Sequence, residues 1–305
     1  MKKSGELMQA IQIVFKNIAQ VLLLDNPITG AFILVGLFVG NWKVGLMALV
    51  ASIISLLLAK YMNYSEEEIS AGLAGFNPVL TAVALSIFLV PKWYSIVIIL
   101  IAIVMTLPIG SALSTFLKPY RVPMLTMPFI VMTWMILLMT YEFKFVKSDV
   151  SILPKTLPGI KFPGDHIHWL NAFLSGFSEI FLLKTVIGGA LILIGIFVAS
   201  RKAGLFAILA NIIGFTAVLV LGGNHDQIND GLFGYNVILT ALALGVTFNN
   251  QMIRYLSIVL GIVLTIIIHA SSTTLLMPYG LPVLTLPFVL STWVMLFAGK
   301  NMKEQ

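Results

Sequence analysis

The sequence contains no cysteine and few charged residues. Without cysteine the chain can form no disulfide bond, no thiolate metal site and no cysteine nucleophile. Charged residues make up 10% of its 305 residues, whereas soluble domains carry roughly 25%. Hydrophobic residues account for 59%, and the mean hydropathy is +1.03. These values exclude an ordinary soluble domain and indicate an integral membrane protein.

Signatures of nucleotide and metal enzymes are also missing from the sequence. It has no P-loop, no GxGxxG and no HExxH motif, so we expect neither ATP-driven transport nor a cofactor or bound metal. The net charge of +6 comes from Lys and Arg that occur singly or in pairs. This distribution is typical of interfacial anchors rather than of a nucleic-acid surface. We therefore expect no nucleic-acid and no nucleotide partner.

Apolar runs recur along the whole chain. They include residues 28–39, 96–107, 185–198, 205–221 and 255–270. Several are near or below the roughly 20 residues that a straight span needs, so some can be half-helices. Glu6 and Gln12 interrupt the first residues, which therefore do not predict a cleaved signal peptide. We predict an all-α, multi-pass membrane protein.

The chain contains an internal duplication with an offset of 159 residues. This offset places GLAGFNPVLTAVALS (72–86) on GLFGYNVILTALALG (231–245), with nine identical positions. The same offset pairs Gly30 with Gly189, Gly45 with Gly204, and Trp134 with Trp293. A constant offset predicts a first repeat at 1–145, a second repeat at 165–305, and between them, at 146–164, a proline-containing surface linker.

Each repeat is predicted to contain about five helices, some of them broken. In the first repeat we expect an amphipathic segment at 8–24, spans at 27–40 and 44–59, a polar loop at 61–70, an interrupted segment at 72–90, a long span at 94–117, and a helix ending near 141. Five full spans per repeat would make the repeats inverted, with a binding site near the bilayer midplane between them. Lys2, Lys3, Lys300 and Lys303 favour cytoplasmic termini.

One motif occurs twice, as VPMLTMPF at 122–129 and LPVLTLPF at 281–288. If these stretches are helical, Pro128 frees the carbonyl of Met124, and Pro287 frees that of Val283. The threonines between the prolines would add hydroxyl acceptors beside those carbonyls. In a membrane such backbone is tolerated where it packs against protein or lines a wet cavity. The candidate residues of this motif are Pro123, Thr126, Pro128, Pro282, Thr285 and Pro287.

Gln20 and Glu179 occupy equivalent positions in the two repeats. Glu179 is the only acid in the apolar run 171–183, and a charge there is costly unless it faces a cavity or a partner. The alternative is an interfacial carboxylate paired with Lys184. The equivalence of the two positions favours a shared role in binding a polar solute.

Aromatic and asparagine residues form a second equivalent set. Phe76 and Tyr235 lie in the matching GFN and GYN sequences, where they could form flat walls. Leu80 and Leu239 follow four residues later, on the same helix face. We expect Asn77 and Asn236 to brace the broken helices, which is a structural role.

The histidines do not form a recognisable catalytic or metal-binding pattern. His225 and Asp226 could suggest an intramembrane enzyme, but their first-repeat counterparts fall in the polar loop, so a hydrated loop is the better explanation. His166 and His168 lie in the linker region or beside it. His269 ends an apolar run, where we expect packing rather than ligation.

The doubled motif, together with NPITG at 26–30, GFNPVLTA from Gly75 and GYNVILTA from Gly234, resembles the signature of the urea transporter family. The resemblance covers nearly the whole chain. It implies two inverted five-helix repeats around a continuous pore, homotrimers with one pore per protomer, and passive, channel-like transport of urea in the cell membrane.

The resemblance also implies roles for individual positions. Thr126 and Thr285 match the threonines of a central constriction, and Gln20 and Glu179 match polar residues of two outer binding slots. Apolar and aromatic lining positions correspond to Phe76, Tyr235, Leu73, Leu232, Leu80 and Leu239. The chain departs from the family pattern at Leu23 and Leu182, where slot aromatics are expected.

The chemistry of urea agrees with these residues, because urea is flat, neutral and rich in N–H donors that need acceptors once water is lost. Other solutes and mechanisms remain open. A water or glycerol channel is expected to carry Asn-Pro in both repeats. The second repeat has Asn236–Val237 instead, which counts against such a channel. Ammonium transport is disfavoured because no histidine pair recurs at matching positions. A proton-coupled urea carrier using Glu179 stays an alternative.

Overall fold

The computed structural model describes residues 2–62, 64–143, 146–148, 166–248 and 254–301. These residues are mainly helical, with one isolated bridge between Leu89 and Ser148, so the all-α prediction is confirmed. The chain divides into two compact units. The first comprises Met1–Pro119, Pro123–Val150 and Ile194–Ala199, and the second comprises Tyr120–Val122, Ser151–Leu193 and Ser200–Gln305. Most of the linker predicted at 146–164 lies outside the described residues.

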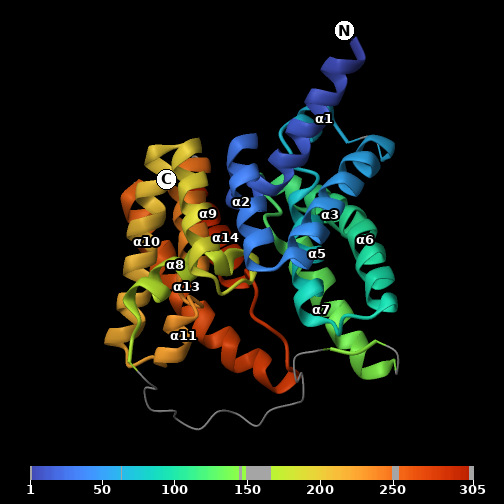
Figure 1. Ribbon diagram of the computed structural model, residues 1–305. Helices are drawn as coiled ribbons and strands as arrows, with labels where there is room; N and C mark the ends of the chain where they lie inside the picture. Colours follow the sequence, from blue (N-terminus) through green and yellow to red (C-terminus); the bar gives the residue numbers. More distant parts are fainter. Residues whose placement is uncertain (1, 63, 144–145, 149–165, 249–253, 302–305) are drawn as a thin grey trace. The chain divides into compact units, whose positions relative to one another are not determined.

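The first unit is built around helix α5, which packs against α3, α6 and α7 (Figure 1). Its helices are α1 (Lys2–Ala19), η1 (Gln20–Leu22), α2 (Pro27–Gly40), α3 (Trp42–Tyr61), α4 (Glu66–Ser70), α5 (Phe76–Phe88), α6 (Trp93–Leu117), and α7 (Met127–Glu142). The short 3₁₀ helix η2 (Lys118–Tyr120) follows α6. One cluster of its core joins Ile13 of α1, Leu56 of α3, Ile69 of α4 and Leu107 of α6.

The second unit is built around α12, which packs against α8, α10, α13 and α14. Its helices are α8 (Trp169–Ser178), η3 (Glu179–Phe181), α9 (Val186–Ala199, whose last six residues group with the first unit), α10 (Arg201–Val220), α11 (His225–Asn229), α12 (Gly234–Leu242), η4 (Ala243–Thr247), α13 (Arg254–Leu276), η5 (Met277–Tyr279) and α14 (Leu286–Asn301). Its core cluster includes Ala210, Val237, Leu244, Ile262 and Met295.

Helix bounds repeat at the same offset as the sequence. Counterparts 159 residues apart begin and end together in η1 and η3, α2 and α9, α3 and α10, α4 and α11, and α7 and α14. The main departure is α5, which stays α-helical to Phe88, whereas the matching segment changes to the π-helix η4 at Ala243. The two sequences therefore encode the same local structure over most of their length.

Four described helices are long and apolar enough to cross a membrane alone, namely those at Trp42–Tyr61, Trp93–Tyr120, Arg201–Val220 and Arg254–Tyr279. Two further apolar pairs are sharply bent: α1–η1 against α2 by 78°, and α8–η3 against α9 by 74°. The helices α5, α7, α12–η4 and α14 are apolar but shorter. The prediction that some helices in each repeat are broken or shorter than a full span is therefore confirmed.

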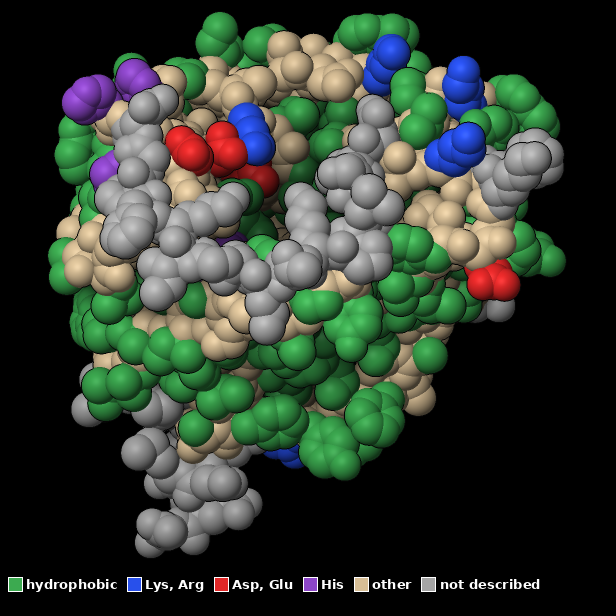
Figure 2. All heavy atoms as spheres, turned by 90° about the horizontal axis from the view of Figure 1, so that it is seen from below, with side chains coloured by type: hydrophobic (Ala, Val, Ile, Leu, Met, Phe, Trp, Pro, Cys, Tyr) green, Lys and Arg blue, Asp and Glu red, His purple; other side chains and the backbone are tan. Residues whose placement is uncertain are grey.

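Much of the surface is apolar, as a lipid environment requires. In each of the four long spans, fewer than half of the residues are buried within the protein. Figure 2 shows hydrophobic side chains covering much of one face, with charged side chains gathered in a few places. Leu57, Ile101, Leu209 and Val263 are examples of exposed apolar residues on the spans. A multi-pass membrane protein accounts for this surface.

Side chains that cap backbone groups fix where several helices begin. The Asn26 carboxamide accepts from the backbone N–H groups of Ile28 and Thr29, which starts α2 with Pro27 in its first turn. Ser65 and Glu68 form a capping box that starts α4. The polar loop predicted at 61–70 therefore contains a short helix.

Candidate functional site

The two equivalent polar residues begin short 3₁₀ helices that end in a left-handed leucine. Gln20 is followed by Leu23 with φ 59°, and Glu179 by Leu182 with φ 58°. In each case the leucine N–H donates to the carbonyl of Gln20 or Glu179 at 2.9 Å. Positive φ is strained for leucine, and its repetition marks a fixed bend immediately after a buried polar side chain.

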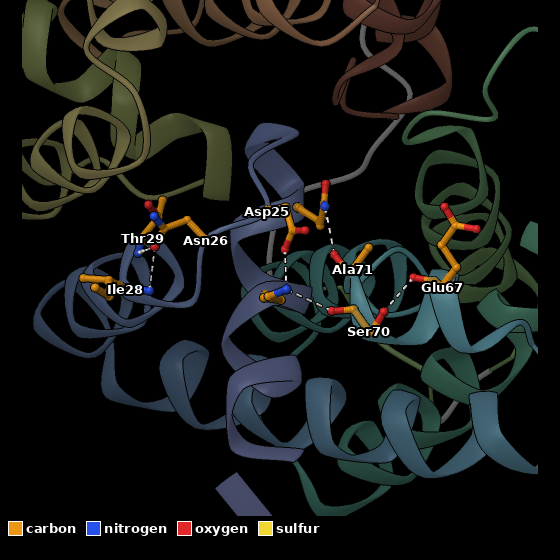
Figure 3. Close-up of polar contacts among 9 residues, drawn as sticks. Asp25, Asn26, Ile28, Thr29, Glu67, Ser70 and Ala71 are labelled. Carbon is orange, nitrogen blue, oxygen red and sulfur yellow. Dashed lines mark hydrogen bonds and ion pairs between the residues drawn. The ribbon is translucent and has the colours of Figure 1, made fainter. Parts of the chain in front are cut away.

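In the first unit, this bend lies beside the turn that follows α4. The Gln20 side chain is 7% exposed, and its Nε2 donates to the Ala71 carbonyl at 2.8 Å. Lys16 Nζ donates to the Ser70 carbonyl at 3.1 Å and forms an ion pair with Asp25 at 2.8 Å. Figure 3 shows Ser70 and Ala71 accepting these contacts, with Asp25 next to them.

In the second unit, Glu179 takes the place of Gln20 but has a different environment. It is 5% exposed, and its Oε2 has no hydrogen-bond partner among the described residues. Lys184 pairs with Asp230. Among the described residues no ion pair joins Glu179 to Lys184, the alternative considered from the sequence. An acceptor atom in this position can take an N–H bond from a solute.

Two glycines allow the turn to pack closely on the bent helix. Gly72 has φ 76°, and a Cβ on it would lie 2.6 Å from the carbonyl carbon of Lys16. Gly231 has φ 79°, and a Cβ there would lie 2.4 Å from the Gly176 nitrogen. Any side chain at either position would push the turn away from the helix that carries Gln20 or Glu179.

The doubled motif is a turn followed by a helix, which corrects the helical interpretation. Pro128 and Pro287 are the second residues of α7 and α14, where a missing N–H costs nothing. Pro123 and Pro282 lie in the irregular stretch before the turn. The carbonyls of Met124 and Val283 are not freed, because each accepts an N–H from three residues later, at 3.3 Å in both cases.

An asparagine clamp holds each motif turn. In the first unit, Asn77 Nδ2 donates to the Leu125 carbonyl at 3.0 Å, while its Oδ1 accepts the Phe129 N–H at 3.2 Å. In the second, Asn236 makes the same two bonds with Leu284 and Phe288, both at 3.2 Å.

The clamped leucines precede the motif threonines and are also left-handed. Leu125 has φ 50° and Leu284 has φ 52°. The clamp therefore stabilises strained backbone immediately before Thr126 and Thr285. Both threonines are buried, with 1% and 3% of their surfaces exposed. The helices α5 and α12 carry the asparagines that hold the backbone on either side of these threonines.

The predicted aromatic and leucine positions lie in different environments. Phe76 and Tyr235 are buried at the starts of α5 and α12, and the Tyr235 hydroxyl donates to the Leu284 carbonyl at 2.6 Å. Exposure of the predicted leucines ranges widely: Leu80 and Leu239 are buried, Leu23, Leu182 and Leu232 are half-buried, and Leu73 is 40% exposed.

The histidines predicted from the sequence lie in two different environments. His225 and Asp226 lie in the short helix α11 and not in an irregular loop. No group of three metal-binding side chains occurs in the described part of the chain. His269 is buried in α13 and contacts Asn236, a neighbour that its position in an apolar run did not suggest.

Sequence reasoning missed a polar contact that joins the bent helix to its neighbours. Asn17 Nδ2 bonds to the carbonyl and hydroxyl of Ser52 at 3.2 and 3.0 Å, and a Cβ on Gly75 would overlap its carboxamide. The only available signal was an asparagine three residues before Gln20 in an amphipathic helix.

Comparison with known proteins agrees with this architecture. The family model described as urea transporter matches residues 11–300. Urea transporter 1 of Ovis aries is 30% identical over 308 residues, covering 99% of this chain and 80% of that protein. Urea transporter 1 of Capra hircus is 29% identical with the same coverage, and that of Rattus norvegicus is 28% identical over 97% of this chain and 79% of that protein. The chain belongs to the urea transporter family, a family of membrane transporters and not of enzymes.

Proposed function

We propose that the protein conducts urea passively across the membrane, down its concentration gradient and without a cofactor. Family membership supports urea as the solute. The observation that carries the proposal is the repetition of one arrangement in both units. Each unit holds a buried threonine after an asparagine-clamped leucine, and a buried amide or carboxyl before a fixed bend.

The acceptors in this arrangement suit a flat solute with several N–H donors. Urea must exchange its hydration contacts for protein acceptors, since an unpaired polar group in an apolar environment costs several kcal/mol on hydrocarbon scales, about 4–8. Thr126 and Thr285 are proposed to supply hydroxyl and carbonyl oxygens at the constriction, and Gln20 and Glu179 to supply side-chain oxygens at the outer slots. Weak sites in series allow a solute to leave as readily as it enters.

Apolar walls would complete the selectivity. We propose that Phe76 and Tyr235, with Leu23, Leu182, Leu73, Leu232, Leu80 and Leu239, present flat or apolar surfaces to urea. Such walls accommodate a thin plate and give hydrated ions no replacement for their water. Tyr235 differs from Phe76 because its hydroxyl is already bonded to a backbone carbonyl, which fixes the orientation of the ring.

The proposal extends to assembly and location by family resemblance. We propose a homotrimer with one path per protomer, inserted in the cell membrane through two inverted repeats with both termini in the cytoplasm.

Stopped-flow light scattering on proteoliposomes tests the proposed function. Urea, glycerol and water fluxes are compared with and without a proton gradient. Urea flux above that of glycerol and indifferent to the gradient is the expected result. Glycerol flux equal to urea flux would favour a general channel for small neutral solutes.

A second candidate is a proton-coupled urea carrier, favoured by the buried Glu179 Oε2 that has no partner among the described residues. Urea accumulation driven by the proton gradient, and lost in Glu179→Gln, would establish this mechanism and refute passive conduction.

A further inference from the structure

We propose that His269 is a positioning residue for urea passage, which fixes Asn236 and, through it, the turn that carries Thr285. This inference rests on the proposed function. It concerns a difference between the two units, because the position equivalent to His269 in the first repeat is Gly110.

The Asn236 carboxamide has only one possible orientation. Its Oδ1 accepts the Phe288 N–H at 3.2 Å, and its Nδ2 donates to the Leu284 carbonyl at 3.2 Å. Exchanging the amide oxygen and nitrogen would set a donor against the N–H and an acceptor against the carbonyl. The second hydrogen of Nδ2 then remains for His269 Nδ1, which lies 3.3 Å away.

This contact determines the state of the imidazole. Because Nδ2 of Asn236 can only donate, Nδ1 of His269 must accept, so the ring is neutral and carries its proton on Nε2. A proton on Nδ1 would place two donors against each other. The backbone partners of Asn236 thus select one tautomer of His269.

Aromatic rings hold the imidazole in place. The Phe233 ring centroid lies 4.6 Å from that of His269 at an interplanar angle of 42°, and the Tyr235 ring lies at 6.0 Å in an edge-on arrangement. His269 is 5% exposed. Its ring therefore supports Tyr235 as well as Asn236, two neighbours that both bond to the Leu284 carbonyl.

In the first unit, a methionine and not a histidine occupies the corresponding space. A Cβ on Gly110 would lie 3.5 Å from the Met124 sulfur and 3.7 Å from Pro128, so methionine occupies the adjacent space. The residue equivalent to Met124 is Val283, which is shorter. The second unit therefore has His269 and Val283 where the first unit has Gly110 and Met124. The histidine adds a hydrogen-bond acceptor for Asn236.

Two variants separate the acceptor from the ring. His269→Phe keeps an aromatic ring beside Phe233 but removes the acceptor, and it is expected to lower urea flux about threefold to tenfold because a buried N–H loses its partner. His269→Asn places an amide oxygen near the position of Nδ1 and should restore flux to within about twofold of the wild type. His168→Asn, at an exposed site, is the matched control.

Two further readouts exclude a merely structural role. In an Asn236→Leu background, His269→Phe should cause no additional loss of flux if it acts through Asn236. Nitrogen-15 NMR of histidine-labelled protein, which has four histidines, should show His269 with a deprotonated Nδ1 and a protonated Nε2.

The outcomes distinguish this inference from the proposed function. Absence of urea flux in the wild type would refute the proposed function, while the NMR spectrum would still decide the tautomer. Normal wild-type flux that His269→Phe leaves unchanged would overturn the positioning role alone. A proton on Nδ1 of His269 would overturn the clamp geometry. Reduced flux in His269→Phe with rescue by His269→Asn supports it.

Discussion

The two units hold the motif turn with the same asparagine clamp, but a second buried amide, beside the start of the helix that carries the clamp, comes from a different helix in each unit. In the first, the amide that fills the space beside Gly75 comes from Asn17 of α1 and bonds to Ser52 of α3. In the second, the positions equivalent to Asn17 and Ser52 are Gly176 and Asn211, and the amide comes from α10. Asn211 Nδ2 bonds back to the Phe173 carbonyl of α8 at 2.7 Å.

Another difference lies in the polarity around the clamp. The first unit has Gln20, Phe76 and Gly110 where the second has Glu179, Tyr235 and His269. The second unit therefore places a hydroxyl and an imidazole beside its clamped turn, and it has a carboxyl at the position where the first unit has an amide. The clamped turn is thus the common element of the two repeats, whereas the side chains around it differ between them.

Removing the clamp should have the largest effect. Asn77→Leu leaves the Leu125 carbonyl and the Phe129 N–H without their partner, at a cost of about 1–3 kcal/mol for each buried group. We expect a lower thermal midpoint in detergent and at least about a tenfold loss of urea flux, since 1.4 kcal/mol corresponds to a factor of ten.

Asn236→Leu removes the clamp of the second unit. Tyr235 still bonds to the Leu284 carbonyl, but the Phe288 N–H and His269 Nδ1 lose their partner. The cost in stability should therefore be about the same as for Asn77→Leu, which also leaves two buried groups unpaired. Asn41→Ala, which removes only the cap of α3, is the control and should cost about 1 kcal/mol without altering flux per folded protein. Equal flux in all three variants would contradict the importance of the clamp.

Substitution of the outer polar residues, Gln20 and Glu179, should have the next largest effect. We expect it to lower urea flux more than it lowers the thermal midpoint. Glu179→Leu removes a buried carboxyl that has an unpaired oxygen, so the thermal midpoint should not fall, while urea flux should drop about tenfold through loss of an acceptor. Glu179→Gln should retain flux to within about threefold, since an amide oxygen also accepts.

The matching pair in the first unit is Gln20→Leu and Gln20→Glu. Gln20→Leu should lower flux and also weaken packing, because it removes the bond to Ala71. Loss of flux in Glu179→Gln as great as in Glu179→Leu would show that the ionisable carboxyl is required and would support proton coupling.

Exchanging the aromatic residues should have a smaller effect. Tyr235→Phe makes the second unit resemble the first and removes one of two donors to the Leu284 carbonyl. The expected cost is about 0.5–1.5 kcal/mol of stability, with urea flux changed by no more than about twofold. Phe76→Tyr is the reciprocal variant. A large, opposite change of urea-to-glycerol selectivity in the two variants would show that the rings, rather than the backbone turns, control passage.

Breaking the ion pairs should have the smallest effect. Lys16 and Asp25 are 22% and 50% exposed, and Lys184 and Asp230 are 55% and 38% exposed. Exposed pairs contribute roughly 0–1 kcal/mol and are screened by salt. Asp25→Asn and Asp230→Asn should therefore each shift the thermal midpoint slightly, and less at high salt. A salt-independent loss of flux in Asp230→Asn would assign that carboxylate a direct role.

The sequence predicted the helices well where local signals are strong. The limits of α2 agree with the prediction of a span at 27–40, because Asn26 and Pro27 are standard helix-start residues. Because one offset relates the two repeats, a helix predicted in one repeat also predicts its counterpart in the other. The prediction was wrong at the doubled motif, where proline was assigned to a helix interior although it occupies the first turn.

The contacts of the candidate site could not be predicted from spacing. Asn77 bonds to Leu125 and Phe129, about fifty residues away, and such pairing depends on tertiary packing. Left-handed leucines are also unexpected, because leucine disfavours positive φ and the strain is tolerated only where surrounding structure enforces it. The roles assigned to the threonines, Gln20 and Glu179 stay predictions.

Urea flux through Thr126→Val and Thr285→Val tests the acceptor proposal most directly. Valine keeps the shape of threonine and removes the hydroxyl, while the asparagine clamp remains in place. We predict that each variant folds with nearly the wild-type thermal midpoint but conducts urea several-fold more slowly, about threefold to tenfold. Unchanged urea flux in both variants, at equal amounts of folded protein in the liposomes, would contradict the proposal that threonine hydroxyls replace the water of urea.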